Sequence, residues 1–142
     1  MPISISATNG LSGMPAIYEN ATVSAIAATG TINYNVLTQS VLQYTTNASG
    51  NWTLNIRGDG ATTLNSIMLT GQSINIVFMA AQGSPAFINN VVQIDGVTVT
   101  PRWQGGSAPV GGNVNSTDLY TYAILKTGNA TYNVFASLTR FA

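Results

Sequence analysis

Apolar residues recur at every second position along much of the chain, and this period of two constrains the fold more than any other feature. Trp52, Leu54 and Ile56 alternate with polar residues, and residues 31–37 and 131–139 show the same alternation. Side chains of a β-strand point to its two faces in turn, so each segment is predicted to be a strand with one face in a core. The pattern predicts strands at residues 21–27, 31–37, 41–45, 51–57, 73–82, 86–94, 97–100, 119–126 and 131–139.

Turn signals fall between these segments. Asp95-Gly96 separates two of them and supplies the positive φ angles of a type I′ hairpin turn. Residues 62–69 favour one short helix capped by Thr62 or Thr63, although a single 3₁₀ turn fits the same residues. With 142 residues the chain suffices for one domain. We predict an all-β, single-domain antiparallel β-sandwich of the jelly-roll or Greek-key type at residues 21–142, with at most one short helix, preceded by an irregular N-terminal arm at residues 1–20.

Charged residues make up only 6% of the chain and their net charge is zero, against roughly a quarter in ordinary soluble domains. Neutrality does little to keep monomers apart, which favours a protein held in an oligomer or particle over a small secreted domain. The four basic residues are scattered, so nucleic acid is not an expected partner. A membrane is not expected either, because the longest strongly apolar run, residues 76–81, is far shorter than the ~20 residues of a spanning helix. The first residues lack the features of a signal peptide, so synthesis in a cytoplasm is expected.

The chain has few of the residues that usually carry out catalysis. The chain has no histidine and no cysteine, which removes the commonest general base, nucleophile and metal ligands. Asp59 and Asp95 both precede glycine and are expected to form turns, and Lys126 ends a strand at a turn where a solvated lysine is ordinary. We therefore expect no enzyme activity, no catalytic residues, no cofactor and no metal.

Two expected strands are apolar on both faces. In residues 119–126, Tyr120, Tyr122 and Ile124 share one face and Leu119, Ala123 and Leu125 the other; in residues 73–82, Val77 and Met79 lie opposite Ile76 and Phe78. A second apolar face needs cover from a loop, an arm or a neighbouring subunit. Taking subunit cover, we predict that Tyr120, Tyr122, Ile124, Val77 and Met79 form a subunit interface.

A separate ligand or surface contact is predicted at Arg102, Trp103 and Gln104, beside a glycine-rich loop. An exposed indole with amides nearby is the arrangement that stacks on sugar rings. The alternative is that Trp103 folds back as a plug on the end of the sandwich while Arg102 extends outward.

Several segments together resemble a β-module found in tailed phages of marine bacteria and cyanobacteria. They are residues 30–34, 44–58, 66–73, 95–96, 100–109, 124–132 and 141–142. The resemblance covers most of the chain from Gly30 to Ala142 and supplies no catalytic residues. In that family the module commonly closes larger fibre-like or structural proteins.

What the resemblance implies is a virion protein made in a host cytoplasm. The short segment ahead of the module favours a capsid decoration protein or head-fibre component, a homo-oligomer whose partners are its own copies and other virion proteins, the major capsid protein first. The alternative is a tail-fibre or receptor-binding tip that contacts a host surface glycan.

Overall fold

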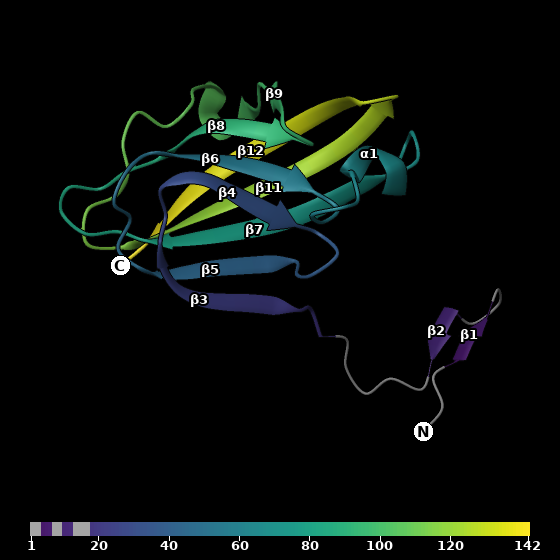
Figure 1. Ribbon diagram of the computed structural model, residues 1–142, viewed down its shortest axis with the longest axis horizontal. Coiled ribbons are helices and arrows are strands. Elements are labelled where there is room, and N and C mark those ends of the chain that lie inside the picture. The colour runs from purple at the N-terminus through teal and green to yellow at the C-terminus, as the bar shows by residue number, and fades with distance from the viewer. Residues whose placement is uncertain (1–3, 7–9, 13–17) are drawn as a thin grey trace.

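The computed structural model describes residues 4–6, 10–12 and 18–142, and its main body is a sandwich of two β-sheets (Figure 1). The strands are β3 (Ala21–Ala27), β4 (Gly30–Asn35), β5 (Val41–Thr46), β6 (Trp52–Arg57), β7 (Ser73–Ala81), β8 (Asn89–Ile94), β9 (Val97–Val99), β10 (Arg102–Trp103), β11 (Thr117–Gly128) and β12 (Thr131–Phe141). The large sheet has six strands in the order β10-β12-β11-β7-β5-β3, and the small sheet has four in the order β4-β6-β8-β9. The predicted all-β sandwich is confirmed, and each expected segment contains a strand.

The N-terminal arm predicted at residues 1–20 lies mostly outside the described residues. Within it, β1 (Ser4–Ser6) pairs antiparallel with β2 (Gly10–Ser12). The first strand of the sandwich, β3, begins at Ala21.

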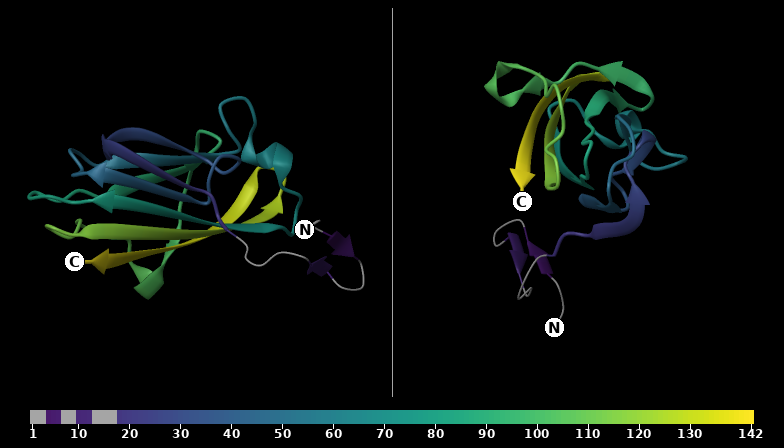
Figure 2. Two further views of the ribbon diagram at one scale, coloured as in Figure 1. Left: turned by 90° about the horizontal axis from the view of Figure 1, so that it is seen from below. Right: turned by 90° about the vertical axis from the view of Figure 1, so that its left-hand side faces the viewer.

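Between β3 and β8 the chain crosses from one sheet to the other at every step. β3, β5 and β7 pair in parallel in the large sheet, and β4, β6 and β8 pair in parallel in the small sheet. The result is a short β-solenoid whose two flattened sides are the two sheets (Figure 2). This half of the chain differs from the antiparallel jelly-roll or Greek-key pairing that we expected. The alternation of side chains tells which face of a strand is buried but says nothing about the direction of its neighbours.

The second half of the chain closes the solenoid with antiparallel strands. β11 pairs antiparallel with β7 on one side and with β12 on the other, and β9 folds back on β8. The β8–β9 turn is the hairpin predicted at Asp95-Gly96, with φ of 52° and 80° at the two residues. Both values are positive, as a type I′ turn requires.

Aromatic side chains fill the core between the sheets. Trp52 is fully buried and meets the rings of Phe78 and Tyr120 edge-on, with centroids 5.8 and 5.6 Å apart. Tyr122 stacks on Tyr120 at 6.4 Å. Such contacts stabilise a core beyond the apolar area that they bury. The expected burial of Trp52 is confirmed.

Asn89 bonds to several polar atoms of this core, although the buried Trp52 Nε1 has no hydrogen-bond partner. Its side-chain amide donates to the carbonyls of Trp52 and Val91 (2.9 and 2.8 Å), and its Oδ1 accepts from the Tyr122 hydroxyl (2.7 Å). The Asn89 backbone N–H donates to the Tyr120 hydroxyl at 3.3 Å. Burial raises the pKa of the Tyr122 hydroxyl well above its ordinary value, and burial likewise raises the pKa of Tyr120. Both hydroxyls are therefore neutral over the physiological pH range.

The short helix expected at residues 62–69 is α1 (Leu64–Ile67), and its N-cap is Thr63, whose hydroxyl accepts from the Ser66 N–H at 3.1 Å. Two charged side chains hold its ends. The Asp95 carboxylate accepts from the backbone N–H groups of Leu64 and Asn65 (2.6 and 2.9 Å). At the other end the Lys126 ammonium donates to the carbonyls of Asn65 and Met68 (2.6 and 2.7 Å).

This arrangement corrects the expectation of a solvated lysine. Lys126 is 6% exposed and belongs to the interior. Its position at the end of β11 places it beside the last carbonyls of α1, where a positive charge is favourable.

Candidate functional site

The outer side of the large sheet carries the most distinctive surface of the molecule. We call it the apolar face and define it by seven residues that point away from the core: Val41, Val77, Met79, Leu119, Ala123, Leu125 and Phe135. The strand register places them side by side, with Val41 beside Val77, Met79 beside Leu119 and Ala123 beside Phe135. Six of them are half-buried and Phe135 is 45% exposed. Polar residues, among them Gln43, Asn75, Thr121 and Ser137, lie between these seven on the same side of the sheet. None of the described outward residues on β5, β7, β11 and β12 is charged, and Arg102 stands at the border on β10.

The structure divides the predicted subunit interface between the two sides of the sheet. Tyr120, Tyr122 and Ile124 are fully buried in the core, so they have no surface to offer a second subunit and that part of the prediction is wrong. The two tyrosine rings fill the space between the sheets, and Asn89 bonds to both tyrosine hydroxyls. Val77 and Met79 do lie on the apolar face, half-exposed.

Phe135 belongs to the same face, although the prediction did not include it. The signal was present in the sequence, because Phe135 breaks the polar side of an otherwise regular alternation in residues 131–139. A large apolar side chain at a polar position of a strand indicates that the second face is not an ordinary solvent-exposed surface.

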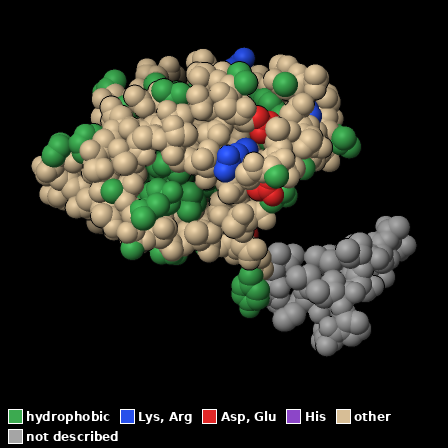
Figure 3. All heavy atoms as spheres, in the orientation of Figure 1, with side chains coloured by type: hydrophobic (Ala, Val, Ile, Leu, Met, Phe, Trp, Pro, Cys, Tyr) green, Lys and Arg blue, Asp and Glu red, His purple; other side chains and the backbone are tan. Residues whose placement is uncertain are grey.

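The outer side of the small sheet is built differently, and we call it the polar face. Its outward residues on β4, β6, β8 and β9 include Thr31, Asn33, Asn35, Thr53, Asn55, Arg57, Gln93 and Thr98, with Val91 as an apolar member. They bond to one another across parallel strands: Asn55 Nδ2 donates to Asn33 Oδ1 at 2.9 Å, and Arg57 Nε donates to Asn35 Oδ1 at 2.8 Å. Figure 3 looks onto this side, which is mostly polar side chains and backbone with few charges.

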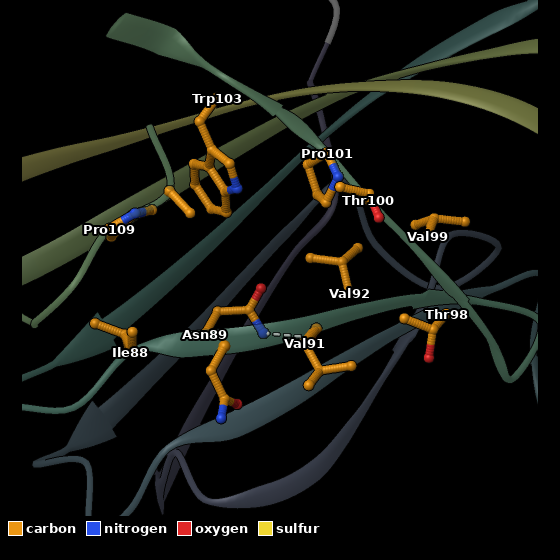
Figure 4. A pocket seen from close by; sticks show the side chains of 12 residues that line it. Ile88, Asn89, Val91, Val92, Thr98, Val99, Thr100, Pro101, Trp103 and Pro109 are labelled. Carbon is orange, nitrogen blue, oxygen red and sulfur yellow. Dashed lines mark hydrogen bonds between the residues drawn. The ribbon is translucent and has the colours of Figure 1, made fainter. Parts of the chain in front are cut away.

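Trp103 lies at the open edge of the sandwich, where β10 pairs with β12. Its ring meets Tyr120 and Tyr122 edge-on, with centroids 6.4 and 6.3 Å away, and the residue is half-buried. It therefore packs on the core as the plug alternative describes. The same ring forms one wall of a cleft of about 300 Å³ between the β8–β9 hairpin and β10 (Figure 4). The opposite wall includes Val92 and Val99, whereas the Thr98 hydroxyl points away from the indole.

Arg102 and Gln104 are exposed and lie on the other side of β10. The Arg102 guanidinium lies over the Phe135 ring, 5.9 Å from its centroid, close enough for a cation–π contact. Arg102, Trp103 and Gln104 together border a shallow depression of about 350 Å³ that also includes Phe135 and Thr121. The three predicted contact residues thus meet at the edge of the apolar face, while the indole ring of Trp103 serves the cleft.

The carboxylates of the sandwich hold backbone and amide groups. Asp59 Oδ1 accepts from the N–H groups of Ala61 and Thr62 (2.8 and 2.7 Å). These hydrogen bonds lower the pKa of the Asp59 carboxyl, and the bond from Ala61 has the largest effect. Asp95 binds the start of α1, as described above. Asp118 is fully buried and accepts from the Gln82 amide and from two nitrogens of Asn113. In the described part of the chain there is no group of three acidic, histidine or cysteine residues that could hold a metal ion.

No family model, no curated protein and no solved structure matches the chain. Within residues 4–6, 10–12 and 18–142, no helix is long and apolar enough to cross a membrane.

Proposed function

We propose that the chain is a structural protein of a tailed-phage particle, a capsid decoration or head-fibre component that works as one of many packed copies. The observation that carries the proposal is the apolar face, where seven apolar side chains and the polar ones between them on four adjacent strands include no charge among the described residues. Covering apolar area stabilises an assembly by about 2.5 kcal/mol per 100 Å² removed from water. The phage part of the proposal depends on the sequence resemblance described above.

Partners on this face are copies of the chain and the major capsid protein. Most carboxylates of the sandwich are engaged in turns, caps and buried amide bonds, which fits a protein whose role is binding and not turnover. The polar face then remains on the outside of the particle, where its amide and hydroxyl groups meet water.

A charge placed on each face tests the first step of the proposal. Met79→Lys introduces a charge in the middle of the apolar face, and Gln93→Lys introduces the same charge at a half-exposed position of the polar face. We expect sedimentation velocity to show self-association of the wild type that Met79→Lys weakens and Gln93→Lys leaves unchanged. Equal effects of the two variants, or a wild type that stays monomeric, would count against the apolar face as the contact surface.

Location on the particle needs a direct measurement. Antibody raised against the full chain and applied to intact particles of a phage that encodes it is expected to label the head in electron micrographs. Label confined to the tail tip favours the second function given below, and particles without label refute the virion role.

A second function, glycan recognition at a tail tip, is favoured by the cleft under Trp103. An indole wall with polar residues such as Asn90 and Thr100 also in the lining suits a neutral sugar ring, and the described lining residues carry no charge. The two tryptophans make the test internally controlled, because Trp52 is fully buried while Trp103 borders the cleft. Titration with galactose and glucose is expected to shift the indole N–H resonance of Trp103 and not that of Trp52, with Trp103→Phe providing the assignment. If neither resonance moves at millimolar sugar, the cleft does not recognise neutral hexoses.

A further inference from the structure

The two sheets end in four edge strands, and these differ sharply in length and chemistry. On one side of the molecule the edges are β9, with three residues, and β10, with two. Pro101 lies between these two strands, and Arg102 belongs to β10. On the other side the edges are β3, with seven residues, and β4, with six. Short length, proline and charge are the devices that keep sheet edges from pairing with other chains.

The β3–β4 side has few of these devices. Residues 21–35 contain no charged residue and no proline. Val23 and Ile26 of β3 are 64% and 49% exposed. A β-bulge interrupts the pairing of β3 with β5 between Ser24 and Ala27, so the regular part of this edge is the stretch from Ala21 to Ser24 together with the whole of β4. We call this side the open edge.

Both strands of the open edge belong to the first coil of the solenoid. They are joined by Ala28 and Thr29 alone, so their free backbone groups lie on the same side of the molecule, one in each layer (Figure 2). The last coil, in contrast, is closed by β11 on β7 and by β9 on β8. The first coil therefore presents unpaired N–H and C=O groups in two layers at once, among the residues that the structure describes.

We propose that the open edge pairs with the open edge of a second copy of the chain, which extends both sheets across a two-fold interface. A single added strand can satisfy only one layer, whereas a second copy offers two edges at the same spacing. A two-fold axis perpendicular to the sheets sets β3 antiparallel to its copy and β4 antiparallel to its copy. Because the edge carries no charge, its two copies meet without like-charge repulsion. This pairing uses backbone edges and not the apolar face, so it is independent of the proposed function.

Hydrogen–deuterium exchange of the full-length wild type is the first test. We expect backbone amides in residues 21–35 to exchange more slowly as the protein concentration rises through the dimer dissociation constant, with no such change in residues 97–103. Sedimentation equilibrium on the same samples gives the dissociation constant. This measurement uses the wild type alone, so its result does not depend on whether any variant folds.

A matched pair of variants is the second test. Val23→Lys places a charge on the open edge. Val97→Lys places the same charge on β9, the short edge strand at the opposite side of the small sheet. The two sites are similarly exposed, Val23 at 64% and Val97 at 68%. Two-fold pairing brings each new lysine close to its copy, so we expect Val23→Lys to weaken the dimer by about tenfold or more and Val97→Lys to leave it unchanged. Circular dichroism establishes that both variants are folded.

Three outcomes overturn the proposal, and the second of them separates it from the proposed function. A wild type that stays monomeric at hundreds of micromolar excludes the pairing. A dimer whose residues 21–35 gain no protection associates through another surface, and sensitivity to Met79→Lys then identifies the apolar face. Residues 21–35 that are protected even in the dilute monomer are already covered by the chain's own segment 1–17 and are not available to a partner.

Discussion

The two outer faces of the sandwich cover the same core but carry different outward side chains. On the polar face, amide and hydroxyl side chains bond to one another along the parallel strands, as Asn55 does with Asn33. On the apolar face, Val77, Met79 and Leu119 fill the corresponding outward positions. Since both faces cover the same core, the core does not determine this difference. This difference is the observation on which the proposed contact between the apolar face and a partner rests.

The largest expected effect concerns which side of β11 is the inside. Ile124 is fully buried, whereas its neighbour Leu125 is half-exposed on the apolar face. Ile124→Ala is expected to lower the free energy of unfolding by about 2–5 kcal/mol, and Leu125→Ala by clearly less. Urea unfolding of the two variants measures the contrast. Equal losses would mean that both sides of β11 are packed in the isolated chain.

Alkaline pH is expected to lower the free energy of unfolding through the buried tyrosines of the core and not through the side chains of the two outer faces. Burial raises the pKa of Tyr34, Tyr120 and Tyr122 in the folded chain above the unfolded value of about 10, so the stability held by the neutral hydroxyls is complete below about pH 10 and is lost as the pH rises toward the folded pKa values. Unfolding by urea at several pH values, with absorbance at 295 nm to follow tyrosinate, measures this loss. Tyr122→Phe should flatten the decline above pH 10, and an unchanged decline would remove Tyr122 from its cause.

A smaller effect is expected from the polar face. Asn55 donates to Asn33 and accepts from the Gly96 N–H at 2.8 Å, so Asn55→Ala is expected to lower the free energy of unfolding by about 1 kcal/mol. Thr121→Ala on the apolar face is the matched variant and is expected to stay within about 0.5 kcal/mol of the wild type. Thermal unfolding of both variants makes the comparison. If Thr121→Ala costs as much as Asn55→Ala, the hydrogen-bond network of the polar face adds nothing.

The smallest effect is expected where the apolar face meets its charged border. Removing the cation–π contact in Arg102→Ala should change the free energy of unfolding by no more than about 1 kcal/mol, because Arg102 is exposed. Arg102→Lys keeps the charge and serves as the control. A larger loss in the alanine variant would show that the guanidinium also packs on the depression beside Gln104.

The sequence predicts the strands far better than it predicts their arrangement. Alternation located β3 to β9, β11 and β12, and Asp95-Gly96 located one hairpin, because these signals depend on neighbouring residues only. The parallel winding of β3 to β8 depends on contacts between segments far apart, and no local pattern encodes it. β10 was missed because two residues carry no period.

The candidate site was predicted in part for the same reason. Residues 119–126 are apolar on both faces, so their alternation alone cannot say whether Tyr122 or Ala123 points inward. Tyr122 points inward, where its hydroxyl donates to Asn89 Oδ1, a residue 33 positions away in the sequence. Likewise, the burial of Lys126 depends on the carbonyl of Met68 in α1. Val77 and Met79 of β7, in contrast, do lie on the outer side of the sheet, opposite the buried Ile76 and Phe78.

Placing Lys126 and Asp118 in the interior leaves three acids and three arginines accessible, so the exposed charge is as balanced as the total. Ionic strength therefore has little to screen, and the hydration of this surface depends on amides and hydroxyls instead. Moderate changes in ionic strength should accordingly change the solubility of the protein little through charge screening, whereas excluded salts such as sulfate should strengthen contacts made through the apolar face.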